Sequence, residues 1–194
     1  MGPSDEMPDA LQRAFALVCA QAAEHTWMPG GEPLPFCQRC TGLYVGASLA
    51  FLLRWAVSLR PARLDHWIDG LLLLQMVPLG YHWVPQGPVL RTLSGLLFAF
   101  GLVGFLSLLP RTYLGLGRPR TPTRVRFLAC AAALGDAAIL LLVSCGGRAA
   151  HHVLALAGLS GLLLLAGLAV ANLALTLNAL LRALGLQRFS GLHS

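Results

Sequence analysis

Long apolar runs separated by short polar stretches dominate the chain from residue 41 onward. Each run approaches or exceeds the ~20 residues that cross a bilayer. Helices are expected there because unpaired backbone groups are too costly in lipid. The pattern therefore predicts an all-α, polytopic transmembrane helix bundle of about five spans, at Thr41–Leu59, Leu64–Val84, Thr92–Leu109, Val125–Ser144 and from Val153 as far as Leu184.

The tail before the first run has a weaker pattern. Over Asp9–Glu24, apolar residues recur at three- and four-residue spacing and predict an amphipathic helix at the interface: Leu11, Phe15, Val18 and Ala22. The segment "MPGGEPLPF" then forms a Pro/Gly-rich loop. We expect three regions: an N-terminal tail (1–40), a three-span core (41–110) and a two-span C-terminal extension (111–194).

Composition supports the membrane interpretation and limits the classes of partner that we expect. Charged residues make up 11% of the chain, against about 25% in a typical soluble protein. The net charge of +6 comes from arginine alone. Arginine could indicate phosphate or nucleic-acid binding, but aromatic and basic residues do not alternate as a stacking surface requires. We therefore expect membrane lipids, and no nucleic acid, as partners; a homo-oligomer or an unknown membrane partner stays open.

Arginine placement predicts the orientation. On one side of the five spans lie four arginines: Arg13, Arg39, Arg91 and Arg148. On the other lie nine: Arg60, Arg63, Arg111, Arg118, Arg120, Arg124, Arg126, Arg182 and Arg188. The positive-inside rule makes the second side cytoplasmic. We expect a multi-pass protein of the bacterial inner membrane, uncleaved at its acidic N-terminus, with "PFCQRCTGLYVG" on the extracytoplasmic side.

The Cys-x-x-Cys pair in that segment, Cys37 and Cys40, has three interpretations. Its spacing suits half of a tetrahedral zinc site, which Cys19 and His25 would complete. Alternatively Cys37 and Cys40 form a redox-active disulfide, which an oxidising compartment would favour, or they are small residues that close a loop. Arg39 between them would lower a thiol pKa and so help either chemistry. Cys130 and Cys145 are expected to be ordinary buried cysteines.

Ionisable residues inside spans are functional candidates by default. Asp69 begins the second span, Arg91 opens the third and Asp136 lies near the middle of the fourth. They offer a third hypothesis, a lipid-processing enzyme or a small-solute transporter. We see no catalytic triad, P-loop or zincin motif, so enzymatic activity stays open and catalytic residues unassigned. Glycines at short spacing in the spans predict close helix packing: Gly42, Gly46, Gly101, Gly104, Gly158 and Gly161.

Taken together, these motifs resemble a family of predicted bacterial and archaeal membrane proteins, the domain of unknown function 2085. The matching block is Cys19, Gln21, Cys37, Arg39, Cys40, Thr41, Gly42, Tyr44 and Gly46, followed by Asp69-Gly70 and Arg91-x-x-Ser94-Gly95. The chain departs from the family pattern at Ala20, where His is usual, and at His25-Thr26, where Arg-Ser is. The resemblance covers about Cys19 to Leu109 and implies a membrane site from Cys19, Cys37, Arg39, Cys40, Asp69 and Arg91. It implies no activity.

Overall fold

A computed structural model describes residues 12–13, 15–57, 63–80, 83–115 and 122–184. In these residues every regular element is helical, apart from an isolated β-bridge between Thr26 and Cys37. The all-α prediction is confirmed. Two short 3-10 turns, η1 and η2, precede five longer helices and one short one: η1 (Ala23–His25), η2 (Pro29–Gly31), α2 (Gln38–Val57), α3 (Arg63–Leu74), α4 (Met76–Gly80), α5 (Pro88–Tyr113), α6 (Pro122–Cys145) and α7 (Arg148–Ala183).

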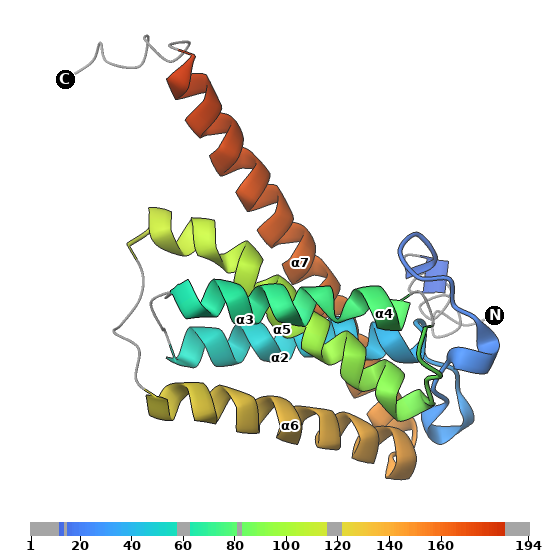
Figure 1. Cartoon of the computed structure of the whole chain (residues 1–194). Helices are drawn as coiled ribbons and strands as arrows, with labels where there is room; N and C mark the ends of the chain where they lie inside the picture. The colour runs from blue at the N-terminus through green and yellow to red at the C-terminus, as the bar shows by residue number, and fades with distance from the viewer. Residues whose placement is uncertain (1–11, 14, 58–62, 81–82, 116–121, 185–194) are drawn as a thin grey trace.

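The helices run back and forth between the two ends of the molecule (Figure 1). The N-terminal loop lies at the end where α2, α5 and α7 begin and where α4 and α6 stop. The α2 helix is central and packs against α5, α7 and α6. The order and direction of the helices follow the five apolar runs of the sequence, with α3 and α4 sharing the second run.

Four helices begin three to five residues before their predicted starts, namely α2, α5, α6 and α7, and three further differences concern a break or an end. The second run breaks at Gln75, whose side-chain amide donates to the backbone oxygen of Ser94 on α5 at 3.0 Å. The third run continues through Pro110 to the end of α5 at Tyr113. The N-terminal helix stops before Cys19 instead of reaching Glu24. Gln21 there has a φ of +50°, a left-handed conformation that is incompatible with a continued α-helix.

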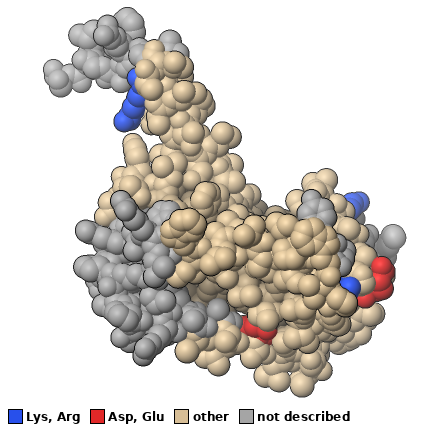
Figure 2. Space-filling view, viewed as in Figure 1, with Lys and Arg blue, Asp and Glu red and all other residues tan. Residues whose placement is uncertain are grey.

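The structure supports the membrane interpretation in part. Within the described residues, Pro88–Pro110 and Arg148–Ala183 are long and apolar enough to cross a membrane, while Trp67–Gly80 and Ala133–Cys145 are shorter apolar helices. The number of five spans is therefore not confirmed. Where Figure 2 shows described residues, the surface between the loop end and the tip of α7 is almost wholly uncharged, apart from one small acidic patch.

The glycines predicted to pack helices do lie at close contacts, four of them with backbone atoms of another helix. A Cβ at Gly42 would meet the Thr92 carbonyl oxygen of α5, and a Cβ at Gly161 would meet the Tyr44 carbonyl oxygen of α2. Gly158 faces the ring of Phe36, and Gly104 faces an ion pair described below. Small residues let helices approach closely where lipid gives no hydrophobic driving force. These contacts hold α5 and α7 directly against α2.

Candidate metal centre

Three cysteine thiols converge at the loop end of the bundle. The Sγ atoms of Cys19, Cys37 and Cys40 all lie within 4.8 Å of one another. Cys19 is buried and the other two are half-buried. Cys37 directly precedes α2 and Cys40 lies in its first turn, and residues three apart at a helix start face the same side. The arrangement offers three sulfur ligands to one metal ion.

Aromatic packing anchors the tail beside α2. Phe15 is fully buried, and its ring lies 4.8 Å from that of Phe36 and 5.3 Å from that of Tyr44, centroid to centroid. Such offset and edge-to-face pairs add about 0.5–1.5 kcal/mol to the area they bury. Because Cys19 follows one turn after Phe15 and Phe36 precedes Cys37, this packing brings the two cysteine segments together.

The loop is also fixed by hydrogen bonds around Gln21. The Gln21 side-chain amide donates to the backbone oxygens of Gln12 at 2.8 Å and Pro35 at 2.7 Å. The β-bridge between Thr26 and Cys37 adds a second tie. A non-glycine residue at positive φ costs of order 1–3 kcal/mol and persists only where its surroundings determine it. The two hydrogen bonds of Gln21 hold it in this conformation, close in sequence to Cys19.

The thiols stabilise one thiolate among them. The backbone N–H of Cys37 donates to Cys19 Sγ at 3.3 Å. Hydrogen bonds from the thiols of Cys37 and then Cys40 hold the pKa of Cys19 well below its ordinary value, although burial opposes this. The pKa of Cys37 is raised, chiefly because its thiol donates to Cys19. The thiolate form of cysteine, and not the thiol, binds metals and acts as a nucleophile. The cluster is therefore suited to metal binding or to thiol chemistry.

His25, predicted as the fourth ligand, makes a different contact. Its Nδ1 lies 2.7 Å from Nη1 of Arg91. A guanidinium only donates, so Nδ1 must be the acceptor and a neutral His25 carries its proton on Nε2. In that tautomer neither ring nitrogen has a free lone pair for a metal. The structure therefore brings together three of the four predicted ligands, which we call the Cys cluster (Cys19, Cys37 and Cys40).

Two arginines, Arg39 and Arg91, make polar contacts near the start of α2. Arg39 donates from Nη2 to the Leu79 carbonyl oxygen at 3.0 Å and to Gln86 Oε1 at 2.8 Å. Arg91 also donates from Nη1 to Oε1 of Gln38 at 3.4 Å. The Nε atoms of both arginines are buried and have no hydrogen-bond acceptor in the described structure. Neither arginine is paired with a carboxylate among the described residues.

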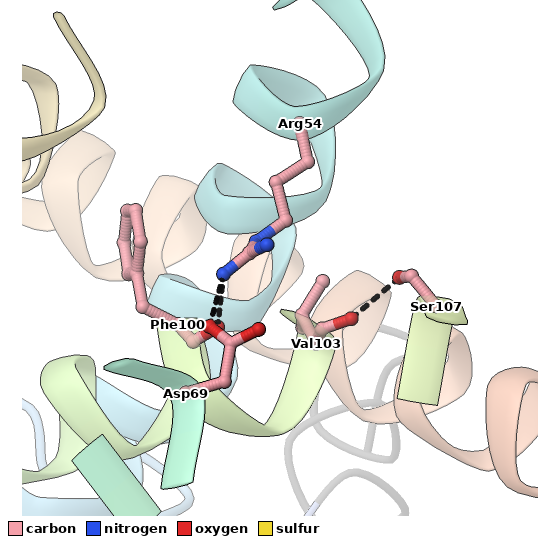
Figure 3. A network of polar contacts seen from close by, with 5 residues as sticks. All are labelled: Arg54, Asp69, Phe100, Val103 and Ser107. Carbon is pink, nitrogen blue, oxygen red and sulfur yellow. Dashed lines mark hydrogen bonds and ion pairs between the residues drawn. The ribbon is translucent and has the colours of Figure 1, made fainter. Parts of the chain in front are cut away.

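Asp69 belongs to a separate site. Its Oδ1 lies 2.6 Å from Nη2 of Arg54, which also donates to the Phe100 carbonyl oxygen at 3.0 Å (Figure 3). Gly104 of α5 leaves the space for this pair. Arg91 precedes Gly104 by thirteen residues on the same helix, which is about 20 Å along the axis. Asp69 and Arg91 therefore do not form one compact site.

The remaining candidates are scattered. Asp136 is buried on α6, and its Oδ1 has no hydrogen-bond partner in the described structure. Cys130 and Cys145 are exposed on the same helix and are not members of the cluster, so the prediction that they are buried is wrong within the isolated chain. Arg148, at the start of α7, makes only an exposed contact with Glu32 at 3.5 Å.

Sequence reasoning missed Arg54 as the partner of Asp69. A signal was present, because Arg54 lies five residues before the end of the first predicted span and Asp69 five residues after the start of the second. In a helical hairpin those two positions have the same depth. The contact of Arg91 with His25 had no comparable signal, because it joins residues 66 positions apart across an irregular loop.

Comparison with known families confirms the resemblance seen in the sequence. Residues 19–106 match the family described as "Predicted membrane protein (DUF2085)". The matched segment includes the whole Cys cluster, Arg39, Arg91 and the Arg54–Asp69 pair. It ends before α6 and α7. Neither the comparison with curated proteins nor that with solved structures gave a match.

Proposed function

We propose that this protein is a five-pass membrane protein whose Cys cluster holds a thiophilic metal ion, with zinc as the first candidate, as a structural or sensing element. The observation that carries the proposal is the convergence of three thiols from two separate segments within 4.8 Å. Soft thiolate ligands favour zinc and copper(I) over hard cations. The low pKa of Cys19 favours its metal-binding form.

A metal in this position would join the N-terminal loop to the start of α2. Cys19 comes from the loop, whereas Cys37 and Cys40 belong to the helix start. An ion that binds only the assembled cluster stabilises the folded loop by mass action, by about 2.7 kcal/mol at one hundred times its dissociation constant. Loading and unloading would therefore change the order of the loop, which is how a sensing element could report metal.

The same thiols favour one second function, thiol–disulfide exchange. A Cys19 thiolate lies beside the Cys37–Cys40 pair, and disulfides exchange by attack of a thiolate on a disulfide sulfur, whose other sulfur leaves as a thiolate. The redox hypothesis requires a disulfide that opens and closes reversibly. The third hypothesis, a lipid-processing enzyme or transporter, receives less support because Asp69 is paired with Arg54, about 20 Å along α5 from Arg91.

Metal content and free thiols of the protein, purified in detergent without reductant, distinguish the two thiol functions. We would measure both for the wild type, Cys37→Ser and the matched control Cys145→Ser, whose thiol is exposed and outside the cluster. About one metal ion per chain, lost only in Cys37→Ser, supports the metal site. No metal, with two thiols missing until reductant is added, would refute it and support the disulfide.

The proposal places the cluster on the extracytoplasmic face, from the arginine distribution of the chain. An oxidising compartment favours a disulfide over free thiols, so a bound metal there would also protect the cluster from oxidation. The same purified protein therefore gives a second check, because metal removal with a chelator in air should be followed by loss of free thiols in the wild type.

A further inference from the structure

Each thiol of the Cys cluster has a buried aromatic ring on its own segment of the chain. We call these rings the aromatic triad: Phe15, Phe36 and Tyr44. The backbone N–H of Cys19 donates to the Phe15 carbonyl oxygen at 2.8 Å. Phe36 directly precedes Cys37. Tyr44 follows Cys40 by about one turn of α2. The triad therefore fixes how the three cysteine segments lie relative to one another.

The rings of the triad have little freedom to move. Their centroids lie 4.8, 5.3 and 6.1 Å apart, and none of the three residues is more than 4% exposed. Protein interiors are close-packed, so a change of even one methylene group is felt by the neighbours. A displacement of one ring is therefore passed to the other two, and with them to the cysteine segments.

The first part of α7 packs on two members of the triad. A Cβ at Gly158 would lie 2.5 Å from both Cε1 and Cζ of Phe36. A Cβ at Gly161 would meet the Tyr44 carbonyl oxygen. Glycine allows this close approach of a helix. The seating of α7 on the triad therefore depends on the absence of a side chain at these two positions.

The same helix also contacts the loop between Cys19 and Cys37. A Cβ at Gly30 of η2 would lie 2.8 Å from the backbone nitrogen of Arg148, the first residue of α7. No member of the Cys cluster comes from α7, which lies outside the family-matched residues 19–106. An influence of α7 on the metal must therefore be transmitted through packing.

We propose that α7 regulates the metal affinity of the Cys cluster by holding the aromatic triad, with Gly158 as the positioning residue. This inference rests on the metal-binding function proposed above. When α7 is seated on Phe36, the three thiols stay assembled for the ion, whereas a displaced α7 lets Phe36 and the adjoining Cys37 move away. By linkage, the bound metal strengthens the docking of α7 to the same extent. The C-terminal extension thereby controls a site that the family-matched segment builds.

The test compares metal affinity among glycine variants of the detergent-purified full chain. Zinc would be titrated against a chromophoric chelator, or copper(I) if copper is the ion found in the purified protein. Gly158→Ala should bind the metal about tenfold more weakly, because the added methyl group displaces the Phe36 ring. Gly167→Ala, on the same helix with open space around it, should bind as tightly as the wild type.

A second control separates positioning from general destabilisation. Gly101→Ala also overpacks a helix contact, because its Cβ would lie 2.8 Å from the Asp69 carbonyl oxygen of α3. It should lower the melting temperature as Gly158→Ala does, yet leave the metal affinity unchanged. Phe36→Leu removes Cε1 and Cζ and should itself weaken metal binding. In that background Gly158→Ala should lose most of its effect on affinity, because the two changes share one contact.

The outcomes distinguish this inference from the metal function. If the wild type binds no metal, the proposed function fails and the inference with it. If the wild type binds metal and Gly158→Ala binds it equally well, only the inference is overturned. An equal loss of affinity in Gly101→Ala would also overturn it, because the effect would then be one of general stability. Should Gly158→Ala fail to fold, Phe36→Leu decides, since wild-type affinity in that variant would overturn the inference.

Discussion

The Arg54–Asp69 pair allows a quantitative test of how the bundle is held together. The two side chains meet at 2.6 Å and are 19% and 2% exposed, respectively. Removing one partner of a buried pair costs about 3–5 kcal/mol, because the other buried charge loses the compensation that the pair supplied. Arg54→Met removes this compensation from the less exposed partner, Asp69, so its cost should lie near about 5 kcal/mol. Asp69→Asn removes it from the more exposed arginine, and its cost should lie near about 3 kcal/mol.

The double variant Arg54→Met/Asp69→Asn should be much less destabilised than the sum of the single variants, because no charge is left buried. Replacement of a whole buried pair is often neutral or stabilising. Unfolding would be followed by circular dichroism while sodium dodecyl sulfate is titrated into the detergent-purified protein. Arg148→Met provides the control, since an exposed pair is worth about 0–1 kcal/mol. Additive single-variant costs, or an Arg54→Met cost under about 1 kcal/mol, would refute this account.

Three further predictions address packing, protonation and orientation. Gly42→Ala should lower the melting temperature in detergent, at a cost of about 1–3 kcal/mol, because its Cβ meets the Thr92 carbonyl oxygen. Gly167→Ala, with open space around it, should gain about 0.5–1 kcal/mol; the opposite ranking would contradict the packing account. Metal affinity should rise from about pH 6 to about pH 8, roughly tenfold per pH unit for each proton released. The reason is that the raised pKa of Cys37 keeps a proton on its thiol, which the metal must displace. An affinity that does not change with pH in isothermal titration calorimetry would exclude thiolate coordination. A membrane-impermeant maleimide should label exposed Cys145 in intact cells, and labelling only after permeabilisation would reverse the orientation.

Most of the helical architecture follows from local pattern. Apolar runs predict the order of the helices because a backbone in lipid must satisfy its own hydrogen bonds. The glycine spacing predicts close packing, and Gly161 against Tyr44 is an example. The break at Gln75 is less predictable, since it depends on a hydrogen bond to Ser94 on another helix. The conformation of Gln21, after the early end of the N-terminal helix, likewise involves a distant residue, because its side chain donates to the carbonyl oxygen of Pro35.

For the candidate site, too, one part could be predicted from the sequence and another could not. The convergence of Cys19 with the Cys-x-x-Cys pair could be anticipated from residue types and motif spacing. The contact that occupies His25 could not, because spacing along the chain does not show which side chain of a distant helix faces a loop. Arg91 and His25 meet only once α5 is placed against the start of α2. Ligand sets predicted from a sequence are therefore weakest where a loop supplies them.

The α7 helix is longer than the thickness of a membrane requires. Its 36 residues span about 54 Å, whereas a hydrocarbon core is about 30 Å thick. Its buried residues all lie between Ala150 and Leu165, Asn172 still donates to the Leu106 carbonyl oxygen of α5 at 2.7 Å, and the distal part of the helix leaves the bundle obliquely (Figure 1). Helices longer than the local bilayer accommodate the excess by tilting. We therefore expect the distal part of α7 to change its inclination with the thickness of the host bilayer, while the contacts of Gly158 and Gly161 hold the first part of the helix against the bundle.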